Sequence, residues 1–287
     1  MIISGESYHS DAAGMRLYRH RFSPAHATQP LAGVVLMLHG LGDHLECHAR
    51  AALEVFCPRG WHCVGVDWPG NGRSDGKRGH IDSVAHAMDI IDEALNQVRQ
   101  EYGPSLPVGY YAHSTGALIL LQYLRLRGPG RIPWLWLSSP LLVPTWRQSA
   151  FKVAAAPIVA RLLPRFTVDT GVRPPECFRI TGTPEQLRKR FAHCHHHISL
   201  GFGADLIRHG ATIGECADAI TDPTALLLTQ GSADVICPPR FSEPWFERVP
   251  AVRKRYALLP GLHHETLREP EDSAVVAANQ WLDGIGS

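Results

Sequence analysis

A chain of 287 residues is long enough to bury one large hydrophobic core, so it needs neither disulfide nor metal staples to fold. Its composition, 45% hydrophobic and 19% charged residues, is that of an ordinary globular protein and excludes a disordered or fibrous one. The 28 basic and 27 acidic residues leave a net charge of +1, which argues against a general nucleic-acid-binding protein, because such proteins carry a strong basic excess.

The seven cysteines form no Cys-x-x-Cys pair, and an odd number of thiols cannot close completely into disulfides. We therefore expect free, mostly buried thiols and a reducing compartment. The amino-terminal segment lacks the basic start, apolar run and cleavage site of a signal peptide, and no apolar stretch reaches the roughly 18 residues that span a bilayer. Together these features predict a soluble, cytoplasmic protein.

The order of the predicted elements indicates the fold class. An alternating stretch at 16–22 predicts an antiparallel hairpin at a sheet edge, and apolar runs then alternate with helical patterns. The expected strands are residues 34–38, 63–67, 108–112, 134–138, 225–229 and 255–259. The expected helices are residues 45–57, 83–101, 115–126 and 273–285. This alternation predicts an α/β fold with a mainly parallel sheet covered on both faces, in which functional groups collect at the carboxyl ends of the strands.

The alternation breaks between about 140 and 220, where prolines separate short helical pieces and no convincing strand is found. An insertion between two strands of the sheet explains this break most simply. We therefore expect a core formed by residues 1–140 and 221–287, with residues 141–220 inserted as a helical cap.

A candidate nucleophile lies in the segment 108–118, which is predicted to run from a strand through a tight turn into a helix. A serine in such a turn, here Ser114, exposes its hydroxyl above the sheet and beside the amino end of the helix. Small residues must flank it because the backbones approach closely; Gly116 follows the usual G-x-S-x-G pattern, whereas Ala112 replaces a glycine. Taken alone, a serine that merely caps a helix explains the motif about equally well.

Two further loops supply the partners that a serine nucleophile needs. Asp234 follows the strand at 225–229, and His263 and His264 follow the strand at 255–259. A histidine can take the proton of the serine, and an aspartate can fix the tautomer of the histidine and stabilise the imidazolium. The chain order serine, acid, histidine is the order found in the α/β-hydrolase fold. The residues alone leave His263 and His264 as equivalent candidates for the base.

The loop after the strand at 34–38 supplies a site for negative charge. Its sequence, HGLGDH at 39–44, lets the backbone N–H of Leu41 point with that of Thr115 at the place where an oxyanion would form. The glycines keep this backbone free of obstructing side chains. We expect His39 to support the loop structurally.

With these motifs assembled, the chain resembles the monoacylglycerol lipase and serine lysophospholipase branch of the α/β-hydrolase superfamily over nearly its whole length. The matching segments are 39–44 (H-G-x-G-E-H in that branch), 67–76 (D-x-x-G-H-G-x-S-x-G, with Asn71 in place of histidine), 137–140, 231–234 and 261–265 (G-x-x-H-E). The resemblance implies a mostly parallel eight-stranded sheet with an inserted helical cap.

The resemblance also implies roles for single residues. It identifies Ser114, Asp234 and His264 as the catalytic triad, and it makes His113 and His263 neighbours that line the substrate site. The implied activity is hydrolysis of a monoacylglycerol, lysophospholipid or similar monoacyl ester through an acyl-enzyme on Ser114, with no cofactor. The turn reads A-H-S-T-G-A instead of G-H-S-M-G-G, so the acyl-chain length is not predicted. Two alternatives stay open: acyl transfer to an acceptor other than water, and a non-catalytic ligand-binding protein on the same fold.

Charge is unevenly distributed along the chain. Residues 147–190 contain nine basic and three acidic residues, a local charge of +6, which leaves −5 for the remainder. The apolar stretch at 151–163 has basic flanks, so the cap could make transient contact with an anionic membrane surface. A cap helix packed on its own core explains the same pattern about equally well.

The histidine-rich run at 193–197 raises the question of a metal site. On a helix, His193 and His197 would share one face, with Cys194 at its edge. No second ligand pair with the spacing of a structural zinc site accompanies them. We therefore expect no metal and place these histidines at the cap surface or at the entrance of the site.

Overall fold

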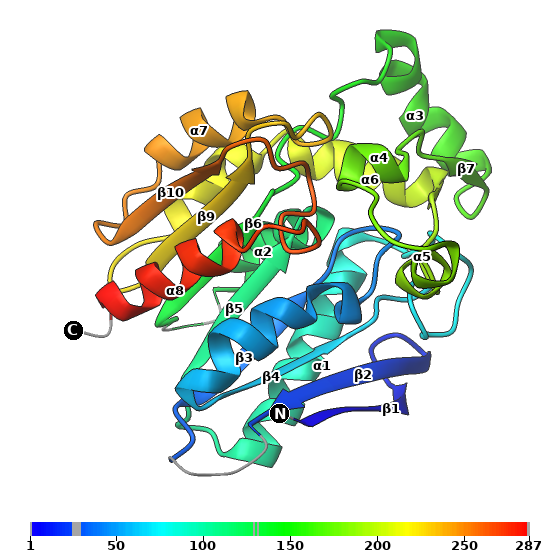
Figure 1. Ribbon diagram of the computed structural model, residues 1–287. Helices are drawn as coiled ribbons and strands as arrows, with labels where there is room; N and C mark the ends of the chain where they lie inside the picture. The colour runs from blue at the N-terminus through cyan, green and yellow to red at the C-terminus, as the bar shows by residue number, and fades with distance from the viewer. Residues whose placement is uncertain (1, 25–29, 129, 131, 286–287) are drawn as a thin grey trace.

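An eight-stranded sheet forms the centre of the molecule in the computed structural model, which describes residues 2–24, 30–128, 130 and 132–285 (Figure 1). The strand order is β1-β2-β4-β3-β5-β6-β9-β10. The strands are β1 (Ile2–Ser10), β2 (Met15–Ser23), β3 (Gly33–Leu38), β4 (Trp61–Val66), β5 (Val108–His113), β6 (Trp134–Ser138), β9 (Ala225–Gly231) and β10 (Lys254–Leu259). β1 and β2 form an antiparallel hairpin, β2 pairs antiparallel with β4, and the other neighbours pair parallel. The predicted mainly parallel, eight-stranded sheet with its antiparallel edge hairpin is confirmed.

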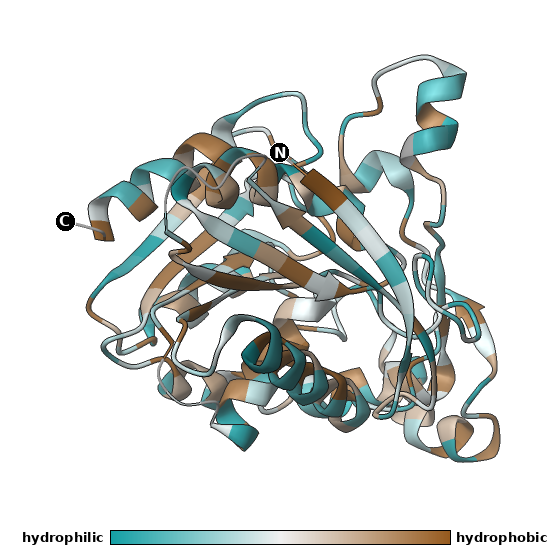
Figure 2. Cartoon of the chain, turned by 90° about the horizontal axis from the view of Figure 1, so that it is seen from below, coloured by the Kyte–Doolittle hydropathy of each residue, from teal (hydrophilic) through white to brown (hydrophobic). Residues whose placement is uncertain are grey.

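Helices cover both faces of the sheet because successive strand residues point to opposite sides. The core helices are α1 (Val84–Tyr102), α2 (Thr115–Arg127), α7 (Pro239–Glu247) and α8 (Ser273–Ile285). Leu36 and Tyr110 point into the core shared with α1, α2 and α7, whereas Val35 and Tyr111 point into the core shared with α8. Figure 2 shows the sheet between two layers of helices, with hydrophobic segments on both the strands and the helices.

The segment predicted as one helix at 45–57 is irregular. It consists of the 3₁₀-helix η1 (Leu45–His48), the π-helical η2 (Ala51–Phe56) and the 3₁₀-helix η3 (Cys57–Arg59). The backbone N–H of Leu45 is held by the Asp67 carboxylate at 3.0 Å, which fixes the start of η1 to the next strand end. The apolar pattern of the sequence predicted a helical element here. It could not predict the contact between Leu45 and Asp67, because this contact joins residues that are far apart in the chain. The predicted helices do not include α7, which contains Pro244, a residue that normally interrupts a helical pattern.

The segment between β6 and β9, which we call the cap segment, lies beyond the sheet, above the end where β5 and β6 finish (Figure 1). Its elements are α3 (Ala150–Leu162), β7 (Thr167–Asp169), α4 (Pro174–Cys177), α5 (Pro184–Arg190), β8 (His197–Ser199), α6 (Leu200–Gly210) and η4 (Ile213–Ala219). α6 joins the segment to the core, because Phe202 and Leu206 are buried in the same cluster as α1 and α2.

The structure corrects two expectations about the cap segment. Residues 140–220 do contain strands: β7 and β8 pair antiparallel, with Thr167 opposite Ser199 and Asp169 opposite His197. Strands of three residues are too short to show an alternating pattern. A turn ends at His193, residues 194–196 form an irregular connection, and His197 begins β8, so the helical spacing considered for His193 and His197 does not apply.

All seven cysteines belong to the described residues and are free thiols, five of them buried, as predicted. Among the described helices, none has both the length and the apolar character needed to cross a membrane.

Candidate active site

Ser114 occupies the turn between β5 and α2 in a backbone conformation that is rare for a residue with a side chain. Its φ is 52° and its ψ is −118°. The hydroxyl donates a hydrogen bond to Nε2 of His264 at 2.9 Å, so it serves this contact and does not cap α2. The helix-cap alternative for this serine is therefore not what the structure shows.

The turn is tight because α2 packs directly on the end of β3. A Cβ on Gly116 would collide with the carbonyl oxygens of Leu38 and His39, so this position requires glycine. Ala112 is fully buried and paired with Leu38 and Leu137 on the neighbouring strands. The sheet thus accommodates the methyl group that departs from the usual pattern.

Three loops bring serine, histidine and aspartate into one hydrogen-bonded chain. His264, after β10, contacts Ser114 through Nε2 and donates from Nδ1 to Oδ2 of Asp234 at 2.8 Å. Asp234, after β9, is fixed because its Oδ1 accepts the backbone N–H groups of Ile236 and Cys237, each at 2.8 Å. All members of the chain are buried. Such an arrangement can move the serine proton to the imidazole while the carboxylate stabilises the resulting cation.

The electrostatics of the site favour protonation of His264. Burial alone would lower the pKa of His264, but the charge and hydrogen bond of the Asp234 carboxylate raise it well above its ordinary value. Burial raises the pKa of Cys237 and so keeps this thiol neutral. The imidazolium formed when Ser114 loses its proton is therefore a stabilised species.

The structure separates the two neighbouring histidines. His263 turns away from Ser114: its Nδ1 hydrogen-bonds to Oε1 of Glu269 at 2.7 Å, and its backbone N–H donates to the same oxygen. It is not among the described residues that line the cavity, so the structure does not place His263 beside His264 at the cavity as the sequence predicted. The Glu269 carboxylate, six residues along the chain, holds it outside.

His113 lies behind His264, as part of a buried group that the sequence did not predict in full. Its ring centre is 4.8 Å from that of His264 and 4.9 Å from that of His48. His48 in turn hydrogen-bonds through Nε2 to Asp43 at 2.7 Å and through Nδ1 to the Tyr111 hydroxyl at 2.8 Å. Burial, with the positive charge of His264, lowers the pKa of His113 and keeps it neutral. Two residues of the group, Asp43 and His48, could have been suspected only because they lie in and shortly after the glycine-rich loop at 39–44.

The loop at 39–44 lies against Ser114, as expected. Leu41 and Thr115 line the same cavity as Ser114, and a Cβ on Gly40 would lie 3.1 Å from Cβ of Ser114. Without a side chain at Gly40, the backbone N–H groups of this loop can approach the serine.

His39 is buried and supports this loop, in agreement with its predicted structural role. Its Nδ1 donates to the carbonyl of Gly40 at 2.7 Å, and its Nε2 accepts the N–H of Trp68 at 2.9 Å. Burial lowers the pKa of His39 to about 4, which keeps the ring neutral and able to accept.

The segment 67–76 braces the same loop from the next strand end. Oδ1 of Asn71 accepts the N–H of Gly42 at 2.9 Å, and the Asp67 carboxylate accepts from His20 and from the N–H of Arg73, both at 2.9 Å. Burial alone would raise the pKa of Asp67, but the hydrogen bond and charge of His20 lower it to about 2. Asn71 thus performs a loop-holding role with its amide oxygen.

A mostly apolar cavity of about 720 Å³ opens above Ser114. The core contributes Leu41, Ile236 and His264, and the cap segment contributes Phe151, Val159, Leu200 and Ile207. The hydroxyl of Ser114 therefore meets an apolar space whose walls come largely from the segment between β6 and β9.

Comparisons with known proteins identify the family of this chain. The Hydrolase_4 family, described as serine aminopeptidase S33, matches residues 29–271. A monoacylglycerol lipase from Mycolicibacterium smegmatis is 28% identical over 98% of this chain and 99% of its own length. A Bacillus subtilis phospholipase, YtpA, is 26% identical over 88% of this chain and 95% of its own length.

Among solved structures, the monoacylglycerol lipase of Paleococcus ferrophilus superposes with a TM-score of 0.78 at 29% identity, covering 95% of this chain and 99% of that one. A soluble variant of the monoglyceride lipase from Saccharomyces cerevisiae, in complex with a substrate analogue, superposes with a TM-score of 0.79 at 20% identity, covering 98% and 94%. The second likeness shows the fold alone.

The raised pKa of His264 predicts how the reactivity of Ser114 depends on pH. Only a neutral imidazole can accept the serine proton, so labelling of Ser114 by a fluorophosphonate should accelerate as pH rises through the pKa of His264. We expect a midpoint above 6.5, the ordinary value for histidine, and a lower midpoint in Asp234→Asn, which lacks the carboxylate that raises the pKa. A midpoint at or below the ordinary value in the unaltered protein would contradict this account.

Proposed function

This chain belongs to the Hydrolase_4 family, as an α/β-hydrolase of the monoacylglycerol lipase branch and a carboxylic ester hydrolase, and we propose that it cleaves esters of monoacyl lipids through an acyl-enzyme on Ser114. The observation that carries the proposal is the hydrogen-bonded chain Ser114–His264–Asp234 at the floor of an apolar cavity. A monoacylglycerol or lysophospholipid has a single acyl chain, which suits one apolar cavity with one nucleophile at its base.

The proposed reaction starts with attack by Oγ of Ser114 on the carbonyl carbon of the ester. The serine proton passes to Nε2 of His264, and the Asp234 carboxylate stabilises the imidazolium. The carbonyl oxygen becomes an oxyanion, for which the N–H groups of Leu41 and Thr115 are the proposed donors.

The intermediate then collapses. The alcohol part of the lipid leaves with the proton from His264, and the acyl group stays on Ser114. Water next gives its proton to His264 and attacks the acyl carbon, after which Ser114 recovers its proton and the fatty acid is released. His113, which lines the cavity and packs on His264, is proposed to contact the bound ester.

We propose residues 141–220 as the cap over this site, since they form much of the cavity wall.

The outer face of α3 supports a transient contact with an anionic lipid surface, because every residue of this helix is exposed or half-buried. Large apolar side chains on and after it face solvent: Ile158 (66% exposed), Leu162 (75%), Leu163 (53%) and Phe166 (55%). Arg161 and Arg165 are exposed on the same helix and shortly after it, so apolar and basic groups share the surface. The free thiols support the cytoplasm as the compartment.

Substitution of the neighbouring histidines tests the catalytic assignment. We expect Ser114→Ala and His264→Ala to reduce kcat/KM for a monoacylglycerol by roughly 10⁴-fold or more, because each removes a member of the proton-transfer chain. His263→Ala serves as the matched control and should retain most of the activity, since its ring contacts Glu269. Loss of activity in His263→Ala with retention in His264→Ala would overturn the assignment. Tight ligand binding without any turnover would instead favour a non-catalytic protein.

Substitutions on α3 test the membrane contact separately. The double change Ile158→Ser and Leu162→Ser should lower turnover of a monoacylglycerol in anionic vesicles by about tenfold, since less apolar surface is buried on binding. Hydrolysis of a soluble short-chain p-nitrophenyl ester should stay unchanged, because neither residue lines the cavity. Val252→Ser, at an 80% exposed position of the core, is the matched control and should affect neither assay. Equal turnover on vesicles by the double variant and the control would exclude the contact.

A further inference from the structure

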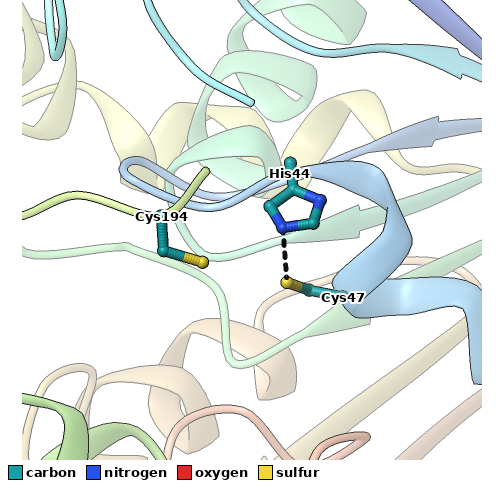
Figure 3. A group of neighbouring side chains, drawn as sticks. All are labelled: His44, Cys47 and Cys194. Atoms are coloured by element: carbon teal, nitrogen blue, oxygen red, sulfur yellow. Dashed lines mark hydrogen bonds between the residues drawn. The ribbon is translucent and has the colours of Figure 1, made fainter. Parts of the chain in front are cut away.

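A second group of reactive side chains lies beside the cavity, outside the Ser114–His264–Asp234 chain. His44, Cys47 and Cys194 each offer one ligand atom, and the three atoms all lie within 4.8 Å of one another. Nε2 of His44 is 3.4 Å from Sγ of Cys47, and Figure 3 shows the thiol of Cys194 directed toward this pair from the other side. His44 is buried and the two cysteines are half-buried, so the group is enclosed yet reachable.

Local backbone geometry explains two of the three positions. His44 is the N-cap of η1 and Cys47 lies three residues later in this 3₁₀-helix. Residues three apart in a 3₁₀-helix lie one above the other, so both side chains emerge on the same side. The pair thus occupies the first turn after the loop that carries Leu41.

The third position depends on how the cap segment is anchored. The backbone N–H of His195 donates to the carbonyl of Gly42 at 2.9 Å, and its ring Nε2 contacts Oδ1 of Asn71 at 3.0 Å. Gly42 has a φ of +76°, and a Cβ there would collide with the His195 carbonyl. These contacts hold Cys194, the preceding residue, against η1, although it is far from His44 and Cys47 in the sequence.

The donor set matches a soft divalent metal ion. Imidazole and thiolate ligands suit Zn²⁺, whereas Mg²⁺ and Ca²⁺ require oxygen ligands. Around a tetrahedral Zn²⁺ with bonds of about 2.0–2.3 Å, a nitrogen and a sulfur ligand lie about 3.6 Å apart and two sulfurs about 3.8 Å apart. The observed separations need only small side-chain adjustments to reach these values.

The charges around the group also fit. Arg268, whose side chain is 8% exposed, forms an ion pair with Oε2 of Glu265 at 2.8 Å, and the same nitrogen lies 3.9 Å from Oδ1 of Asp43. The guanidinium therefore has its own carboxylate partners, and two bound thiolates would balance the charge of a divalent ion. A buried site with balanced charge avoids the cost of an uncompensated ion.

We propose that His44, Cys47 and Cys194 form a binding site for one Zn²⁺ ion, which ties the cap segment to the loop that carries Leu41. Water would complete the coordination, as in zinc sites with three protein ligands. The site does not depend on the proposed ester hydrolysis. It also replaces the ligand set considered from the sequence, because only Cys194 of the run at 193–197 takes part.

Metal titration of the reduced full-length protein tests the site. Zn²⁺ should bind with a stoichiometry of one, and Co²⁺ should give the visible bands of tetrahedral coordination together with thiolate-to-cobalt charge transfer. Cys47→Ser and Cys194→Ser should each weaken Zn²⁺ binding by more than about 100-fold. Loss of a residue that only supports a metal ligand weakens binding by at most about 100-fold, so a larger effect identifies a direct ligand. Cys216→Ser, at a buried thiol of η4, is the matched control and should bind like the unaltered protein.

Hydrogen exchange of the backbone distinguishes a tie between cap and core from simple binding. Zn²⁺ should slow exchange at residues 193–197 in the unaltered protein and in Cys216→Ser. It should not change the exchange rate of these residues in Cys47→Ser. The melting temperature of Cys47→Ser without metal serves to confirm that this variant is folded. Absence of binding at micromolar Zn²⁺, or equal binding by Cys47→Ser, Cys194→Ser and the control, would overturn the proposal. Zn²⁺ binding without slower exchange at 193–197 would overturn the tie.

Discussion

The left-handed backbone of Ser114 is the constraint on which the rest of the site depends. With a φ of 52°, this residue turns the chain from β5 directly into α2 and lifts its hydroxyl above the sheet. The turn closes only because Gly116 lets α2 rest against the backbone at the end of β3. Strain at one serine is therefore maintained by packing between a helix and the central strands, which the two hydrophobic cores make rigid.

Parallel pairing then brings the partners to this serine. β5, β6, β9 and β10 end at the same edge of the sheet, so the loops that follow β9 and β10 reach Ser114 from one side. The loop after β3 reaches it from the other side and is braced by His39 and Asn71. Each of these groups thus sits on a short loop held by rigid strands, and the cap segment adds hydrogen bonds from Glu265 N–H to the carbonyl of Cys177 and from His195 N–H to the carbonyl of Gly42.

Much of this arrangement could be predicted from the sequence because buried strands leave continuous apolar runs and tight turns leave glycines. The strand at 134–138 and the helix at 273–285 were predicted at their observed bounds. The residues alone could not show which of the two neighbouring histidines points toward Ser114. In the structure, Glu269 hydrogen-bonds to the ring of His263 and so distinguishes it from His264. Nor could it show β7 and β8, which are too short to carry a pattern.

The cap segment contacts the loop at 39–44 through residues that are far away in the chain, and no local sequence pattern predicts such a contact. It supplies much of the apolar wall of the cavity, whereas Ser114 and His264 lie on the loops that follow β5 and β10. The most direct test of the central claim is quenched-flow mass spectrometry with a p-nitrophenyl fatty-acid ester, for which acylation is fast enough for an acyl-enzyme to accumulate. We predict a burst of p-nitrophenol and one acyl group on the peptide that contains Ser114. Steady turnover with no burst and no adduct, or an adduct on another residue, would contradict the account.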